Sequence, residues 1–198
     1  MKTCVFITGT NAVGKSALAW AIITRFGGVD RITNDVTYCT DGGFCLAGKY
    51  GITRFGGVDR ITNDKGSSCT SRLAEVVEEG LRNADTIVCE GSFMNTFGLN
   101  LSNALFKAER HLIVSLYADP KTIWERLCGR SNGKYGDGKR RFDLILKKQR
   151  QAMIAAQRWQ SIGVPVLQVN TAVTPVDEVL RLTLEKLDAI CGRTTTTR

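Results

Sequence analysis

The fold is decided by the stretch Gly9-Thr10-Asn11-Ala12-Val13-Gly14-Lys15-Ser16, which fits the pattern G-x-x-x-x-G-K-[ST] of a phosphate-binding loop. The apolar run before it, residues 5–8, predicts a buried strand, and residues 16–23 after it predict a helix. Glycines let backbone N–H groups turn toward an anion, and the first turn of a helix adds the positive end of its dipole. All eight residues are therefore predicted to bind the phosphates of ATP.

Two side chains of this loop have a specific chemistry. Lys15 is long enough to reach the β- and γ-phosphates, so it is also predicted to be catalytic. The hydroxyl of Ser16 is predicted to bind Mg²⁺. The alternative is a chance glycine turn before a helix, and the strand and the helix on either side of the loop argue against it.

The composition favours a single globular domain and argues against several kinds of functional site. The chain has 198 residues, 43% of them hydrophobic, and no apolar run approaches the roughly 18 residues of a membrane span. We expect a single domain over residues 1–192, a disordered tail at 193–198 and no membrane partner. The seven cysteines form no C-x-x-C pair, which indicates reduced thiols and a cytoplasmic location. His111 is the single histidine in the chain, so composition argues against a Ser-His-Asp catalytic site.

The net charge of +8 is concentrated in one segment. Residues 121–150 contain ten Lys or Arg against three Asp or Glu. Such a surplus attracts phosphate groups, whether they belong to a nucleotide or to nucleic acid. A solvated basic surface is the alternative, and composition does not separate the two.

Predicted strands and helices alternate along the chain. Residues 29–35 are predicted to form a second strand that ends in the carboxylate of Asp35, and residues 36–47 a hairpin that turns at Asp41-Gly42. Further strands are expected at 85–91, 112–117 and 164–169, and further helices at 71–84, 120–130, 142–161 and from 174 onward. This alternation predicts an α/β fold with three layers and a mostly parallel sheet of about five strands.

A stretch of thirteen residues, ITRFGGVDRITND, occurs twice, at 23–35 and at 52–64. Two copies do not make a stacking array, so a recent tandem duplication or a sequencing artefact explains the repeat better than a solenoid does. The two copies cannot occupy the same place in one sheet. We expect the first copy to supply the helix end and the second strand, and the second copy to be loop within an insertion at about 36–70.

This order of elements resembles the adenylate-kinase-like P-loop kinases over nearly the whole chain. The resemblance rests on the glycine loop, the strand that ends in Glu90, Asp119-Pro120, and the pair Arg126-x-x-x-Arg130. It implies a lid at about 126–141, whose catalytic arginines Arg126 and Arg130 close over the transferred phosphate, with Arg140 and Arg141 as later ones. The alternative is that Arg126 and Arg130 lie one turn apart on a surface helix.

A closer resemblance is to bacteriophage P-loop kinases that phosphorylate 5-hydroxymethyluracil in DNA. The segments that carry it are residues 48–51 with 55–59, residues 89–91 and residues 97–104. It implies ATP and Mg²⁺ as cofactors, DNA containing a modified base as the partner, and the host cytoplasm as the location. The exact duplication departs from the pattern of that group.

Transfer of a phosphate to a hydroxyl requires a carboxylate near the acceptor. In related kinases that act on hydroxyls the second strand ends in such an aspartate, which makes Asp35 the candidate base, with Asp64 of the second copy as its substitute. Glu90 ends an apolar strand, where a carboxylate can hold Mg²⁺ through water. The alternatives are a turn or cap residue for Asp35 and an ordinary strand-end acid for Glu90.

Three functions compete at this point. The main hypothesis is transfer of the γ-phosphate of ATP to the hydroxymethyl group of 5-hydroxymethyluracil in DNA. The alternative is a kinase of a free nucleotide, a nucleoside or another small hydroxyl compound. The weakest is a non-enzymatic nucleotide-binding module, because the chain has no N-K-x-D motif and the predicted strand at 85–91, after the place of a switch region, ends in Glu-Gly rather than D-x-x-G.

Overall fold

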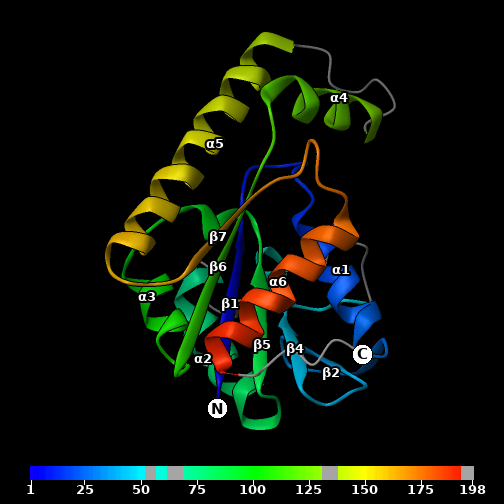
Figure 1. Cartoon of the computed structure of the whole chain (residues 1–198), viewed down its shortest axis with the longest axis vertical. Helices are drawn as coiled ribbons and strands as arrows, with labels where there is room; N and C mark the ends of the chain where they lie inside the picture. Colours follow the sequence, from blue (N-terminus) through cyan, green and yellow to red (C-terminus); the bar gives the residue numbers. More distant parts are fainter. Residues whose placement is uncertain (52–56, 62–68, 131–137, 193–198) are drawn as a thin grey trace.

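The computed structural model describes residues 1–51, 57–61, 69–130 and 138–192, and its strands form one sheet (Figure 1). The strands are β1 (Thr3–Thr8), β2 (Val29–Thr33), β3 (Val36–Cys39), β4 (Phe44–Ala47), β5 (Thr86–Glu90), β6 (Arg110–Tyr117) and β7 (Val166–Asn170). Their order across the sheet is β2-β3-β4-β5-β1-β6-β7. Strand β1, which leads into the phosphate-binding loop, is therefore inside the sheet with β5 and β6 as its parallel neighbours.

Helices cover both faces of this sheet. They are α1 (Lys15–Arg25), α2 (Cys69–Asn83), α3 (Leu99–Leu105), α4 (Pro120–Arg130), α5 (Gly138–Ser161) and α6 (Val176–Cys191), with short 3-10 helices η1 (Val58–Arg60) and η2 (Ser92–Asn95). Helices α1 and α6 pack together on one face, and α2 and α3 pack together on the other (Figure 1). The predicted three-layer α/β class is confirmed.

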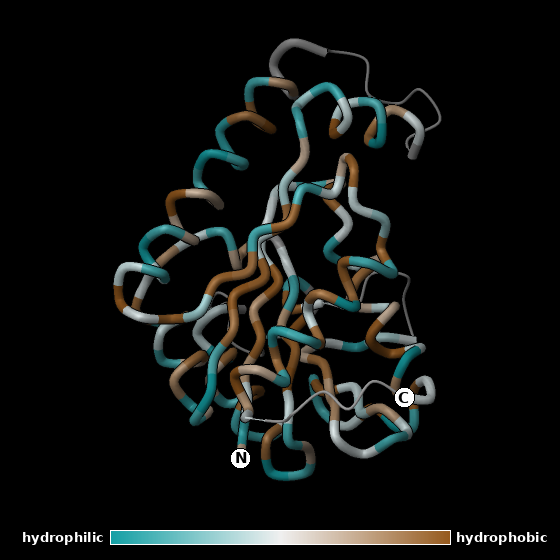
Figure 2. The backbone as a smooth tube through the Cα atoms, viewed as in Figure 1, coloured by the Kyte–Doolittle hydropathy of each residue, from teal (hydrophilic) through white to brown (hydrophobic). Residues whose placement is uncertain are grey.

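The side chains of β1 point alternately to the two faces of the sheet, and apolar residues occur on both, so helices must cover both faces. Val5 and Ile7 belong to the apolar cluster under α1 and α6, whereas Cys4 and Phe6 belong to the cluster under α2 and α3. The central strands are brown over much of their length in Figure 2, while the helices alternate between teal and brown. A strand that is apolar on both faces must be buried on both, and here it is.

The sheet has seven strands, where the sequence predicted about five. The five parallel strands β4, β5, β1, β6 and β7 account for the predicted number. The predicted hairpin at 36–47 is confirmed as β3 and β4. Strand β3 pairs antiparallel to β4, and β2 pairs antiparallel to β3, so both extend the sheet instead of standing apart from it. This extension covers the backbone groups that would otherwise be left open on β4.

The prediction that the second strand runs to Asp35 is wrong. Strand β2 ends at Thr33, and Asn34 turns the chain with a φ of 55°. The parallel neighbour of β5 is β4, and β2 is the edge strand. Because Val36 pairs with Ala47, the start of β3 nonetheless lies beside the carboxyl end of β4. Asp35 therefore reaches the carboxyl edge of the parallel strands through the hairpin.

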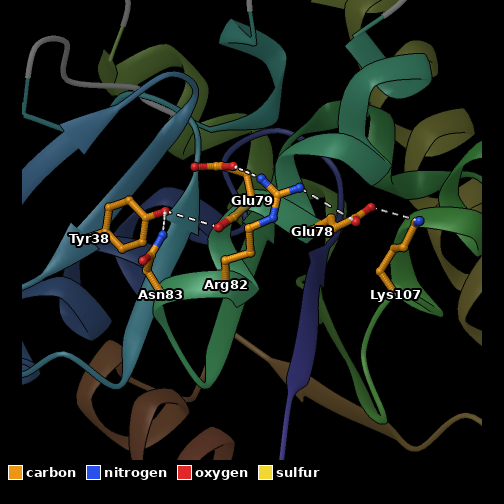
Figure 3. A network of polar contacts seen from close by, with 6 residues as sticks. All are labelled: Tyr38, Glu78, Glu79, Arg82, Asn83 and Lys107. Carbon is orange, nitrogen blue, oxygen red and sulfur yellow. Dashed lines mark hydrogen bonds and ion pairs between the residues drawn. The ribbon is translucent and has the colours of Figure 1, made fainter.

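A polar network on the surface ties α2 to β3 and to the chain after α3 (Figure 3). The hydroxyl of Tyr38 donates to the carbonyl oxygen of Glu79 over 3.3 Å. Lys107 donates to Glu78 over 3.0 Å, and this ion pair lowers the pKa of Glu78. Exposed ion pairs of this kind add little stability, so the network mainly orients the helix pair.

The two copies of the repeated stretch have different structures. As predicted, the first copy supplies the end of α1 and strand β2. In the second copy, Val58–Arg60 forms η1, and Gly57 packs against the end of β5: a methyl group at Gly57 would lie 2.3 Å from the carbonyl oxygen of Glu90. Asp64 and the other residues at 52–56 and 62–68 lie outside the described residues.

The single domain over residues 1–192, the lid at about 126–141 and the disordered tail stay predictions. Helices α4 and α5 flank the proposed lid, whose residues 131–137 lie outside the described part of the chain, as does the tail at 193–198. No helix among the described residues is both long and apolar enough to cross a bilayer.

Candidate functional site

The phosphate-binding loop joins β1 to α1 through a backbone that requires glycine. Gly9 has a φ of 134° and Gly14 a φ of 96°, and helix α1 begins at Lys15 directly after the second of these. A methyl group built on Gly9 would lie 2.3 Å from the carbonyl oxygen of Leu116 on β6. Only glycine combines this backbone conformation with so close an approach. The sequence motif thus reflects both the turn and the packing of the loop against the sheet.

Lys15 folds back over the loop. Its ammonium group donates to the carbonyl oxygens of Gly9 and Thr10, each over 2.9 Å, and only 8% of the residue is exposed. Thr10 and Val13 are buried, whereas Asn11 is exposed. The ammonium group therefore stands among the backbone groups that the motif assigns to phosphate binding.

Three side chains meet at the carboxyl end of β5. Glu90, of which 4% is exposed, accepts hydrogen bonds on Oε1 from the hydroxyls of Tyr50 (2.9 Å) and Ser16 (3.2 Å). Burial raises the pKa of Glu90, while the hydrogen bonds from Tyr50 and Ser16 and the charge of Lys15 act in the opposite direction. The negative charge of Asp59 raises this pKa further. Tyr50 and Glu90 are 40 positions apart along the chain, so no local motif indicates this contact.

The oxygen atoms at this point fit Mg²⁺. Ser16 and Glu90 supply one hydroxyl and one carboxylate, which are ligands that this ion prefers. Within the described residues, no three His, Cys, Asp or Glu side chains gather to form a cage for a metal. Mg²⁺ in kinases is usually held by one or two protein oxygens together with phosphates and water, so a small donor set matches that mode of binding.

Arg126 connects α4 to the loop and to the end of β7. Its guanidinium group donates to the carbonyl oxygen of Thr171 (2.6 Å) and to its hydroxyl (3.1 Å), and more weakly to the carbonyl oxygen of Ala12 (3.4 Å). The guanidinium group of Arg126 thus lies between α4, the phosphate-binding loop and the end of β7, and its predicted contact with the transferred phosphate stays a prediction. Arg130 is the last residue of α4, and its side chain lies outside the described ones, as do those of Arg140 and Arg141.

A pocket of about 340 Å³ opens beside the phosphate-binding loop. Its walls come from the loop, from the start of α1, from α4 and from the segment that joins β7 to α6. The lining residues are Ala12, Val13, Gly14, Ala17, Leu18, Leu116, Arg126, Thr171, Ala172, Thr174, Pro175, Val176 and Val179. The sequence did not indicate this pocket, because its walls are up to 167 positions apart and no motif joins them.

Asp35 lies in a second charged cluster. Only 3% of it is exposed, and its two carboxylate oxygens each face a cation at 3.4 Å, Lys49 for Oδ1 and Arg72 for Oδ2. The carbonyl oxygen of Asp35 also accepts a hydrogen bond from the backbone N–H of Gly48 after β4. Arg72 of α2 was not predicted from the sequence, because nothing local distinguishes it from other helix arginines.

Asn95 is the site residue whose role is least visible in the sequence. It ends η2 and is 5% exposed. Its Oδ1 accepts a hydrogen bond from the backbone N–H of Gly9 over 2.7 Å, and its Nδ2 donates to the carbonyl oxygen of Gly9 over 2.9 Å. The two residues are 86 positions apart along the chain, and no motif in the sequence joins them.

Neither a family model nor a curated protein sequence matches this chain, but solved structures share its fold. The YorR protein of Bacillus subtilis, in complex with phosphorylated GDP, is 16% identical with a TM-score of 0.59, over 96% of this chain and 99% of that one. Shikimate kinase from Bacteroides thetaiotaomicron is 13% identical with a TM-score of 0.51, over 96% and 98%. Deoxyadenosine kinase from M. mycoides with bound dCTP is 12% identical with a TM-score of 0.50, over 96% and 100%.

These similarities show the fold of the P-loop kinases, in agreement with the predicted fold class. They give no support to the finer resemblance to phage kinases of 5-hydroxymethyluracil in DNA. The names of these relatives refer to nucleosides, nucleotides and a small hydroxyl acid, which is closer to the alternative drawn from the sequence.

Proposed function

We propose that this protein is a kinase that transfers the γ-phosphate of ATP to a hydroxyl group of a free nucleoside, a nucleotide or another small compound. One observation carries this proposal. The phosphate-binding loop forms a wall of the 340 Å³ pocket and, through Ser16, also contacts the buried carboxylate of Glu90. The pocket for a nucleotide base therefore adjoins the loop that would bind phosphates, and this loop adjoins the carboxylate at the metal position. The fold shared with kinases that act on small molecules supports it.

The donor nucleotide is assigned to the loop and the pocket. The base enters the mainly apolar pocket, Arg126 lies at its wall, and the loop from Gly9 to Ser16 surrounds the phosphates. Lys15 moves from the carbonyl oxygens of Gly9 and Thr10 to the phosphate oxygens. Ser16 and Glu90 would hold Mg²⁺, which would neutralise charge on the phosphates.

The acceptor is assigned to the side of Asp35. Its hydroxyl oxygen forms a bond to the γ-phosphorus, the bond from that phosphorus to the bridging oxygen breaks, and ADP leaves with the bonding electrons. Asp35 orients the hydroxyl group or takes its proton, and Arg126 with Arg130 stabilises the charge that develops. Asp35→Asn is expected to slow transfer far more than it weakens ATP binding.

The acceptor that the sequence analysis predicted, 5-hydroxymethyluracil in DNA, is tested as a second possibility. The basic segment 121–150 attracts the phosphates of a nucleotide as readily as those of DNA, so charge does not favour the polymer. The third possibility is a module that binds a nucleotide without transferring phosphate.

The experiment is transfer of labelled γ-phosphate from ATP to a panel of acceptors at low salt. The panel contains nucleosides, nucleoside monophosphates, small hydroxyl acids, hydroxymethylated DNA and ordinary DNA. We expect transfer to a small acceptor, its loss in Lys15→Ala, and its retention in the exposed control Lys186→Ala. Transfer to hydroxymethylated DNA alone would replace the acceptor, whereas full activity in Lys15→Ala would overturn the assignment of the loop.

A further inference from the structure

The buried amide of Asn95 makes two hydrogen bonds to a single residue, Gly9. Its oxygen accepts from the N–H of Gly9 (2.7 Å) and its nitrogen donates to the carbonyl oxygen of Gly9 (2.9 Å). Only one orientation of the amide satisfies both bonds, so the assignment of its oxygen and nitrogen follows from the partners. Gly9 has no side chain that could anchor it, so the amide of Asn95 holds it through its backbone groups.

The carbonyl oxygen of Gly9 has a second donor, the ammonium group of Lys15 at 2.9 Å. Lys15 and Asn95 thus share one acceptor at the start of the loop. When Lys15 turns to a phosphate, the carbonyl oxygen of Gly9 loses that donor. A buried carbonyl that loses every donor costs free energy, and the amide of Asn95 prevents this.

We propose that Asn95 is a positioning residue that holds the first glycine of the phosphate-binding loop in place and frees Lys15 to bind phosphate. This role rests on the proposed function. Asn95 acts through Gly9 and Lys15 and does not itself contact the nucleotide.

The position of Asn95 in the fold fits this role. Helix η2 follows Glu90 and Gly91 directly, so the same short segment carries the carboxylate at the metal position and the amide that holds the loop. Helix η2 also packs against β1 and α5. The two ends of the phosphate-binding loop are therefore bonded to neighbouring parts of one segment, Gly9 to Asn95 of η2 and Ser16 to Glu90 of β5.

The experiment compares the affinities of ATP and adenosine, measured by calorimetry, in the wild type, Asn95→Asp and Asn95→Ala. The carboxylate in Asn95→Asp still accepts from the N–H of Gly9, but it has no donor for the carbonyl oxygen and attracts Lys15 away from the phosphates. We expect ATP to bind about tenfold to a hundredfold more weakly in Asn95→Asp. Adenosine, which has no phosphate, should bind within about twofold of its wild-type affinity.

Asn103→Asp is the matched control, because Asn103 is exposed on α3 and the change adds the same charge. A Kd for ATP that is unchanged in Asn95→Asp and Asn95→Ala would overturn the role of Asn95. Equal losses of affinity for ATP and for adenosine would also overturn it, because they would show that Asn95 only maintains the structure. If Asn95→Asp does not fold, the ratio of the two affinities in Asn95→Ala decides. A wild type that binds adenosine but not ATP would overturn the proposed function itself, which is a separate result.

Discussion

At the scale of the residue, Gly9 is a position of the site that leaves no room for a side chain. A methyl group there would meet the carbonyl oxygen of Leu116 at 2.3 Å, at a φ that side chains rarely adopt. We expect Gly9→Ala to lower the free energy of unfolding by at least about 2 kcal/mol. Gly129→Ala is the control, since a methyl group built there has no atom of the described residues outside its own helix within 4 Å, and alanine favours a helix by up to about 1 kcal/mol over glycine. Urea unfolding of both variants measures the difference, and an equally stable Gly9→Ala would contradict the geometry.

The hydroxyl group of Tyr50 is expected to affect how the transfer activity depends on pH. Burial raises the pKa of Glu90, and the hydrogen bond from Tyr50 lowers it. Because the ionised carboxylate is the form that holds Mg²⁺, activity should rise as the pH rises through this pKa. Removing the hydroxyl in Tyr50→Phe should therefore move the rise in activity to higher pH. The measurement is the pH profile of phosphate transfer at limiting Mg²⁺.

The control for this change is Tyr38→Phe, which removes a hydroxyl from the network around α2 and not from the site (Figure 3). Its pH profile should match that of the wild type. If the profile of Tyr50→Phe also matched it, the hydrogen bond to Glu90 would have no part in the ionisation of that carboxylate.

At the scale of the element, α4 is the part of the proposed lid whose contacts are described. It begins with a cap, since Asp119 accepts the N–H of Thr122 over 2.9 Å, and Arg126 ties it to Thr171 and Ala12. We propose that α4 and the start of α5 close over bound ATP and exclude water. Hydrogen exchange in α4 should slow when a nonhydrolysable ATP analogue saturates the protein.

Arg126→Lys keeps the charge but loses the planar fork that reaches Thr171, so the slowing in α4 should be smaller in that variant. Arg158→Lys on the exposed side of α5 serves as its control. Unchanged exchange in the wild type at saturation would remove the lid from the mechanism.

At the scale of the whole molecule, the repeated stretch supplies a test in which the local sequence is held constant. Asp30 and Asp59 are equivalent positions of the two copies. Asp30 lies exposed on β2 and pairs with Arg31, whereas Asp59 lies near Gly91 and raises the pKa of Glu90. We expect Asp59→Asn to move the rise in activity to lower pH, opposite to Tyr50→Phe. Asp30→Asn should leave the pH profile unchanged, and equal effects of both changes would contradict this arrangement.

The same pair shows the limit of sequence-based prediction. Val29–Arg31 lies in strand β2 and Val58–Arg60 forms η1, although the three residues are identical. What differs is the neighbour, β3 for the first copy and the end of β5 for the second. Strand pairing and burial outweigh local propensity here, as they do in the turn at Asn34 that ended β2 before Asp35.

The sequence by itself determined the phosphate-binding loop, the strand before it, the helix after it and the α/β class, because each depends on local requirements: glycine at positive φ, apolar runs and alternation along the chain. Only the tertiary structure decided the seven-strand order, the pocket and the contacts of Glu90 with Tyr50, of Asp35 with Arg72 and of Asn95 with Gly9. These contacts join residues 37 to 86 positions apart. They exist because β5 lies between β4 and β1, and the order of strands in a sheet is set by packing of the whole chain.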